Sequence, residues 1–277
     1  MNLRKTSLFT LAFMLSFSLS FAQTDNRIVL KKGQKYVIEN ITKTSSTTAM
    51  QGMPMEVAID ATTFYEIEVA DSKNDQYNLT NTIKKVKMKI SQMGQEMDFD
   101  SEKEVDLNGP IGDALKNFIN VPQKVILSQQ GKISSDSSNK SAEINSALGD
   151  YESTGFGASL AFQALPKNLK VNQTWEVNTN ESGSIKKTIY TVKSINGDLA
   201  TLTLSGKMDV NTTMENMGME ITTKSQGEFS GEEIVHIKTG VIQSQKMDIT
   251  TEGIVEVMGQ ELPNSSKITS TTTVKMM

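Results

Sequence analysis

Hydrophobic and polar positions alternate with a period of two along most of the chain. In residues 65–69 the sequence Tyr-Glu-Ile-Glu-Val places three apolar side chains on one face and two glutamates on the other. The same alternation returns at residues 77–79, 86–90 and 202–204, and threonine is frequent at 269–273. Because successive side chains of a strand point to opposite faces, this pattern predicts antiparallel strands with one buried and one solvated face.

The middle of the chain departs from this alternation. Pro110 can begin a helix, and apolar residues follow it at helical spacing up to Ile119. A strand pair is expected next, at residues 124–128 and 132–133, followed by a polar run at 134–141 that is typical of a mobile loop. Residues 142–165 contain enough apolar side chains for a second short helix that covers the sheet.

Two short motifs recur in the two halves of the chain. Residues 50–56 (Met-Gln-Gly-Met-Pro-Met-Glu) resemble 214–220 (Met-Glu-Asn-Met-Gly-Met-Glu), and Met-Gly-Gln-Glu at 93–96 recurs at 258–261. The separation along the chain is nearly the same for both pairs, which favours an internal repeat over two hairpins that converged independently. The repeat predicts related β modules with methionine-containing turns at equivalent positions.

These patterns together predict an all-β protein. Two related antiparallel β modules are expected to form a curved sheet, a sandwich or an open barrel, with one or two short helices in the middle segment. The expected division is a signal peptide at 1–22, an N-terminal β module at 23–107, a middle segment at 108–168 and a C-terminal β module at 169–277.

The first 22 residues have the features of a secretory signal. Arg4 and Lys5 precede an apolar stretch that begins at Leu8, and Ser20 and Ala22 place small residues before a cleavage site at Gln23. The alternative is an N-terminal anchor helix, which the interspersed serines disfavour. We therefore expect an exported protein, periplasmic or secreted, with no transmembrane span in the mature chain.

Composition excludes several classes of function. The chain has no Cys, one His and an excess of acidic over basic residues (32 against 28). Thiolate chemistry and multi-histidine metal sites are therefore impossible, and the acidic balance argues against nucleic acid as a partner. A serine-type triad would need a nucleophile on a sharp turn beside His236, and the sequence has no Gly-x-Ser-x-Gly motif to supply one. Carboxylate pairs are abundant, and Glu66 and Glu68 are spaced like those of a solvated strand face. The expectation is a protein that is not an enzyme and needs no cofactor.

Apolar side chains of the middle segment are the first candidate ligand site. They exceed what two short helices can hide from water, so they are expected to cover an apolar surface or to close a cavity over the sheet: Phe118, Phe156, Leu160 and Phe162. The function expected from this is binding of an apolar ligand or of another cell-envelope component. A structural or surface-interaction module without a small ligand is the alternative.

The methionine turns are the second candidate site. Thioethers are soft ligands that suit Cu(I), and pseudo-twofold packing of the modules could bring four of them together: Met53, Met55, Met217 and Met219. Packing, or an adaptable apolar contact surface, explains the same methionines without a metal and is the favoured interpretation.

A family resemblance rests on three short motifs in addition to the signal peptide. They are the Gly33-Gln34-x-Tyr36 opening, the Pro166…Val171-x-x-x-Trp175 segment and the Thr239-Gly240-x-Ile242 turn. With these motifs the chain resembles an exported bacterial β-rich family, domain of unknown function 6263. The resemblance implies export and a β-rich fold, and it brings no catalytic residues. Asn172 departs from the glycine that family members usually carry there.

Overall fold

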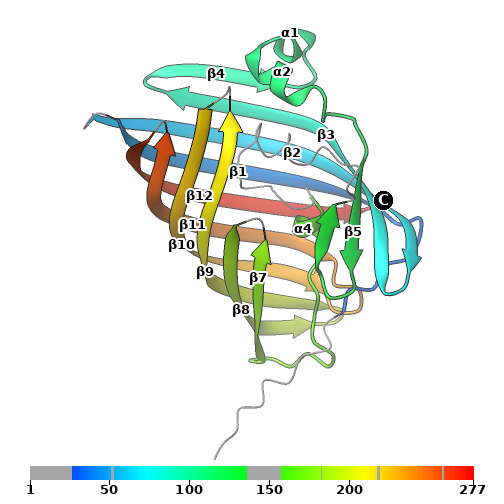
Figure 1. Ribbon diagram of the computed structural model, residues 1–277. Coiled ribbons are helices and arrows are strands. Elements are labelled where there is room, and N and C mark those ends of the chain that lie inside the picture. Colours follow the sequence, from blue (N-terminus) through cyan, green and yellow to red (C-terminus); the bar gives the residue numbers. More distant parts are fainter. Residues whose placement is uncertain (1–26, 51–52, 136–156, 182, 217–218, 258) are drawn as a thin grey trace, which may run out of the picture.

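A computed structural model describes residues 27–50, 53–135, 157–181, 183–216, 219–257 and 259–277. The signal peptide predicted at 1–22 lies outside these residues. Within them the chain forms one antiparallel sheet that curls around a common interior (Figure 1). The predicted all-β class is therefore confirmed, with a curved sheet as its architecture.

The sheet has twelve strands in the order β6-β5-β3-β2-β1-β12-β11-β10-β9-β8-β7, and β4 pairs with the far end of β3. The first and last strands of the chain, β1 and β12, lie side by side at its centre. The strands are β1 Lys35–Met50, β2 Met53–Lys73, β3 Gln76–Gln92, β4 Gln95–Asp100, β5 Gln123–Ser128, β6 Ile133–Ser135, β7 Thr174–Glu181, β8 Ser184–Asn196, β9 Leu199–Asn216, β10 Met219–His236, β11 Ile242–Val257 and β12 Gln260–Met276.

The repeated motifs fall at equivalent turns of two four-stranded meanders, β1–β4 and β9–β12. The first motif spans the turn between β1 and β2 and, in the repeat, the turn between β9 and β10. The second spans the turns between β3 and β4 and between β11 and β12. The sheet order places these meanders side by side and in the same sense, with β1 of one against β12 of the other. This is a head-to-tail arrangement rather than the pseudo-twofold one considered for the methionine site.

Three short helices occur in the described part of the middle of the chain: α1 Glu104–Leu107, α2 Pro110–Leu115 and α4 Ala158–Ala161. The helix predicted to begin at Pro110 does so, and it ends at Leu115 instead of continuing to Ile119. From the second stretch, 142–165, the structure describes only residues 157–165, where α4 forms a single turn. Segment 123–135 adds β5 and β6 to the edge of the sheet beyond β3.

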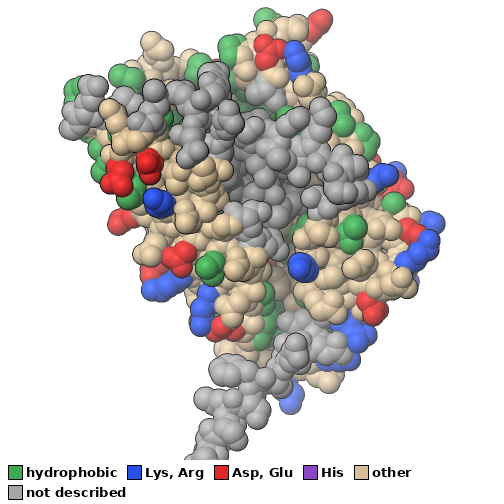
Figure 2. Space-filling view, in the orientation of Figure 1, with side chains coloured by type: hydrophobic (Ala, Val, Ile, Leu, Met, Phe, Trp, Pro, Cys, Tyr) green, Lys and Arg blue, Asp and Glu red, His purple; other side chains and the backbone are tan. Residues whose placement is uncertain are grey.

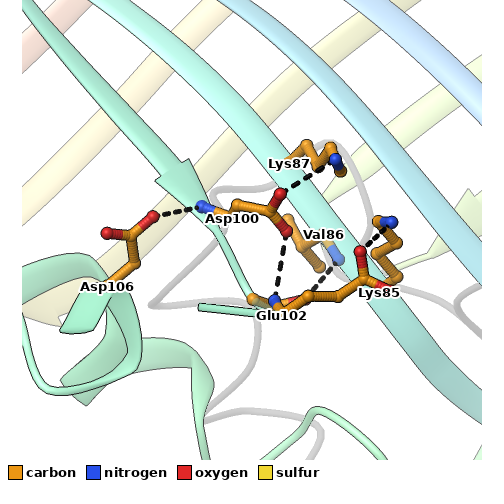
Figure 3. A network of polar contacts seen from close by, with 7 residues as sticks. Lys85, Val86, Lys87, Asp100, Glu102 and Asp106 are labelled. Carbon is orange, nitrogen blue, oxygen red and sulfur yellow. Dashed lines mark hydrogen bonds and ion pairs between the residues drawn. The ribbon is translucent and has the colours of Figure 1, made fainter. Parts of the chain in front are cut away.

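A network of polar contacts fixes α1 to the β3–β4 hairpin (Figure 3). The Asp100 carboxylate accepts a hydrogen bond from the Glu102 backbone N–H at 3.1 Å and pairs with the Lys87 ammonium at 2.8 Å. The Asp100 N–H donates to a carboxylate oxygen of Asp106, within the single turn of α1. The Lys87 ammonium, followed by the Glu102 N–H, lowers the pKa of Asp100, so this carboxylate is charged in its structural role.

Buried side chains define one face of the sheet. We call the face that carries Tyr65, Leu202 and Phe229 the inner face. The largest core cluster gathers residues of the N-terminal half and the middle segment, joined by Val241 and Val274. Two smaller clusters, around Trp175 and around Phe229, belong to the C-terminal half. The hydrophobic packing is thus divided between the halves of the chain, although the sheet is continuous.

Glycines on the inner face of the C-terminal strands allow the sheet to curl tightly. A Cβ on Gly206 would lie 2.1 Å from the Lys187 carbonyl oxygen and 2.3 Å from Cζ of Phe229, which covers this glycine from β10. Gly231 and Gly253 are equally close to the backbone of the neighbouring strand. A glycine inside a strand often marks such a close approach of backbone, and here it permits the curvature.

Candidate functional site

The inner face extends past the core clusters toward one end of the sheet. There, apolar side chains from five strands are only half-buried, in contrast to the fully buried ones beside Tyr65 and Leu202, and Ile249 among them still packs against the Phe229 cluster: Val57, Ile59, Ile90, Val210, Ile249, Val255 and Leu262. Ile59 is level with Thr44, Ile268 and Ile249 in the strand register, so these residues form a continuous row across the centre of the sheet. A concave, partly apolar surface of this kind is where proteins hold apolar ligands.

A buried carboxylate, Glu233, lies on the same face. Its side chain is 1% exposed, and Gln245 on the neighbouring strand donates a hydrogen bond to Glu233 Oε2 at 2.9 Å. The other oxygen, Oε1, has no hydrogen-bond partner among the described residues. Burial raises the pKa of Glu233 to about 7, against the lowering effects of Gln245 and Lys186. The group therefore titrates near neutral pH.

Lys186 brings a positive charge into the same interior. Its ammonium lies 4.6 Å from the ring centroid of Phe229, a cation–π contact. Burial lowers the pKa of Lys186, and the nearby Glu233 carboxylate opposes that shift. The two groups interact electrostatically across the interior without forming a direct ion pair in the described part of the chain.

Aromatic side chains border this polar cluster. Tyr190 stacks on Trp175 with ring centroids 5.1 Å apart and an interplanar angle of 11°. Burial, followed by the nearby Glu233, raises the pKa of Tyr190, which keeps its hydroxyl protonated. The buried Trp175 Nε1 has no hydrogen-bond partner among the described residues. The inner face therefore offers apolar surface together with an unpaired donor, an unpaired acceptor and a half-buried cation.

The structure places the predicted apolar ligand residues mainly in the core. Phe118 and Phe162 are 5% and 6% exposed within the largest cluster, and Leu160 packs against that cluster. Phe162 meets the Tyr36 ring edge-to-face, with centroids 5.3 Å apart. Phe156 lies outside the described residues. The buried pair anchors the middle segment across the sheet, and their contact with a ligand remains a prediction.

The methionines predicted as soft-metal ligands lie in two hairpins of the sheet. Met53 is 67% exposed and Met55 is half-buried, both at the start of β2. Met219 begins β10, and Met217 lies outside the described residues. Four strand spacings separate β2 from β10, or about 19 Å along the sheet. The Cu(I) hypothesis remains a prediction, and this order of strands gives it no support.

Sequence reasoning overlooked Glu233 and Lys186 as members of an interior site. Glu233 shares the inward register of Phe229, Gly231 and Val235, whereas its neighbour Glu232 is exposed. That alternation is the signal that could have identified it, because a residue two positions from a buried neighbour shares its face. Lys186 carried no comparable signal, because the next residue on its face is the polar Thr188 and the adjacent Ile185 lies on the opposite face.

Neither a helix suited to a membrane span nor a cluster of metal-ligating side chains occurs among the described residues. No helix there is both long enough and apolar enough to cross a bilayer. No group of three or more His, Asp or Glu side chains in these residues is arranged to hold a metal ion. An open groove on the outer face is lined by side chains of both signs, of which Lys87 and Lys89 are paired with Asp100 and Glu96.

The sequence profile of a family described as "Family of unknown function (DUF6263)" matches residues 74–139 and 159–242. This agrees with the resemblance noted from the short motifs. No curated protein sequence matches the chain significantly.

Among solved structures, one that is described as showing lipid–protein interactions in lipovitellin aligns with a TM-score of 0.54 and 14% sequence identity. The alignment covers 90% of this chain and 26% of the other, so the chain spans about a quarter of that protein. An outer-membrane channel from Pseudomonas putida F1 aligns over 91% of this chain and 98% of the channel, with 8% identity and a TM-score of 0.27. The first likeness is one of fold alone. The TM-score of the second is too low to establish a shared fold.

Proposed function

The chain belongs to the family of unknown function DUF6263, and we propose that it is an exported, non-enzymatic protein that holds an apolar ligand against the inner face of its sheet. The observation that carries the proposal is the group of seven half-buried apolar side chains toward one end of the inner face, on β2, β3, β9, β11 and β12. Apolar surface left partly uncovered on a concave face is a preferred position for an apolar ligand.

Two further observations support this function. The fold resembles part of lipovitellin, a protein whose structure is described in terms of lipid–protein interactions. The signal-like residues 1–22 and the chain's acidic balance fit an exported protein that does not bind nucleic acid. No catalytic step is proposed, because the chain has no Cys and its single His236 is exposed at the end of β10.

A fluorescent hydrophobic dye and long-chain fatty acids as competitors test the proposal. Dye binding should be saturable and should weaken about tenfold or more in an Ile59→Gln, Ile249→Gln double variant, which exchanges two apolar contacts for amides. The matched control is Ile185→Gln with Ile189→Gln, because these side chains are 53% and 42% exposed on the outer face of β8.

Mass spectrometry of the protein purified from its native envelope would identify any bound lipid. Absence of saturable dye binding, or an equal loss of binding in the outer-face control, would overturn the proposal. Thermal unfolding of both double variants shows whether each is folded under the conditions of the titration.

A further inference from the structure

Four neighbouring hairpin turns, those of the two meanders, lie along one end of the sheet. The turns after β1, β3, β9 and β11 all lie at this end, and their hairpins are neighbours in the sheet order. Adjacent hairpins are two strand spacings apart, about 10 Å, so the four turns span roughly 30 Å. Figure 1 shows these hairpin ends opposite the end that carries the C-terminus. We call the described residues of segments 50–56, 91–97, 214–220 and 256–262 the hairpin rim.

Methionine is concentrated on the hairpin rim. Met53, Met93 and Met97 are 67%, 77% and 48% exposed, and Met50, Met214 and Met219 occupy strand ends beside the turns. Turns at the opposite end of the sheet instead carry Asn74-Asp75 and Asn196-Gly197-Asp198. In Figure 2 hydrophobic side chains lie along the upper left margin, where Figure 1 places the ends of the first hairpins. The methionine-containing turns therefore lie at one end of the sheet, and the exposed methionines at the opposite end, Met276 and Met277, belong to the chain terminus.

The conformation of Met93 shows that local folding does not favour methionine in this turn. Met93 and Gly94 have φ angles of 52° and 77°, as the central residues of a two-residue hairpin turn do. Asn and Asp tolerate this left-handed region best, and Asn74 and Asp75 occupy it at the opposite end of the sheet. A long apolar side chain held there against its backbone preference, and 77% exposed, points to a contact outside the molecule.

The charges on the hairpin rim have one sign. None of the four segments contains Lys or Arg, and each contains glutamate. Glu96 and Glu256 pair with Lys89 and Lys224, which lie outside the four segments. Glu56 and Glu261 are exposed and form no ion pair in the described part of the chain. The rim is therefore both apolar and acidic.

We propose that the hairpin rim is a docking surface for a partner segment that is both basic and apolar, one in which Lys or Arg residues are interspersed with large hydrophobic side chains. Charge complementarity selects the basic residues, and flexible thioether side chains adapt to apolar groups of varied shape. A bilayer is a poorer occupant, because inserting the tips would carry unpaired glutamates into the interface, and anionic lipids would repel them. This partner is distinct from the ligand proposed for the inner face.

A synthetic amphipathic peptide of Leu and Lys, about 20 residues and hence roughly 30 Å long as a helix, is the probe. Fluorescence titration should show saturable binding that weakens about tenfold or more in a Met53→Gln, Met93→Gln, Met97→Gln variant. The matched control is Met276→Gln with Met277→Gln, which removes methionines that are 66% and 65% exposed at the opposite end of the sheet. This control should bind like the wild type.

Three outcomes would overturn the docking proposal. In one, a peptide of Ser and Lys with the same charge binds as tightly as the Leu and Lys peptide, which would mean that charge alone determines binding. In another, both methionine variants lose binding equally. In the third, the rim variant binds the peptide normally but loses binding to phosphatidylcholine vesicles, which assigns the rim to lipid. The Ile59→Gln, Ile249→Gln variant should bind the peptide normally, which separates failure of the rim from failure of the inner-face site.

Discussion

At the scale of single residues, Glu233 is the group with the largest consequence for behaviour in solution. A carboxylate that is 1% exposed, with one oxygen unpaired, is costly to ionise, and the hydrogen bond from Gln245 and the nearby Lys186 offset that cost only in part. Such a group is retained at the expense of stability above neutral pH. We associate Glu233 with the candidate site on the inner face because buried groups with shifted pKa values cluster at functional sites.

Replacing Glu233 with Gln should therefore change how stability depends on pH. Burial raises the folded-state pKa of Glu233 from 4.5 to about 7, so the native protein binds more protons than the unfolded chain between these values. The contribution of Glu233 to stability consequently falls as pH rises through this window. The variant should lose this dependence and be more stable than the wild type at pH 8, by an amount on the order of 3 kcal/mol.

Urea unfolding at pH 5 and pH 8 measures this effect as the difference between variant and wild type. The neighbouring Glu232 provides the control, because it is exposed and pairs with Lys193. In Glu232→Gln the free energy of unfolding should change between pH 5 and pH 8 by the same amount as in the wild type. A wild-type protein whose pH dependence matches that of Glu233→Gln would show that Glu233 has an ordinary pKa.

Met93 gives a second residue-scale prediction. Exchange for Asn at φ 52° relieves a left-handed conformation that costs an ordinary side chain about 1 kcal/mol. Met93→Asn should therefore raise the free energy of unfolding by about that amount while weakening binding of the Leu and Lys peptide. Urea unfolding of the variant checks the expected gain in stability, and peptide titration of the same sample checks the expected loss of binding. Lower stability of the variant would contradict the argument from strain.

At the scale of elements, alternation in the sequence identified the strands but not their curvature. Residues 65–69 and 202–204 lie within β2 and β9 as predicted, because each local pattern reports a buried and a solvated face. Pro110 marked the start of α2 for an equally local reason. The inner-face glycines gave no such signal, because their role depends on the backbone of a strand distant in sequence, as Gly206 and Phe229 show.

Gly206→Ala tests whether these glycines set the curvature. The new methyl group would meet the Lys187 carbonyl oxygen at 2.1 Å, and a backbone atom cannot move aside as a flexible side chain does. We expect a loss of about 3 kcal/mol in the free energy of unfolding, at the upper end for overpacking. Ser230→Ala, an exposed position on β10, should change stability by less than about 0.5 kcal/mol. Equal effects of the two substitutions would contradict this role.

At the scale of the whole molecule, the sheet order could not be read from the sequence. The repeat predicted related modules, but the pairing of β1 with β12 joins residues more than 200 positions apart. Both strands are rich in Ser and Thr, and polar side-chain contacts line their inner face, including Ser46 with Ser266 at 2.6 Å and Asn264 with Thr48 at 2.8 Å. Such strands carry little hydrophobic pattern to specify a partner.

The pairing of β1 with β12 also predicts how the molecule unfolds. Hydrophobic clusters are divided between the two halves, so the β1–β12 ladder is a main link between them, beside the contacts of Val241 and Val274. Thr271→Pro removes a ladder hydrogen bond from a central strand, at an expected cost of about 3 kcal/mol or more. With the ladder weakened, each half should unfold with its own midpoint.

Trp175, the only Trp of the chain, packs in a cluster of the C-terminal half and reports on that half alone. Far-ultraviolet circular dichroism reports on the strands of both halves. In the wild type the two signals should change together during urea unfolding, because the intact ladder couples the halves. In Thr271→Pro they should separate, whereas Thr271→Ala, which keeps the backbone N–H, should leave them coincident. Coincident transitions in the proline variant would show that contacts other than the ladder couple the two halves.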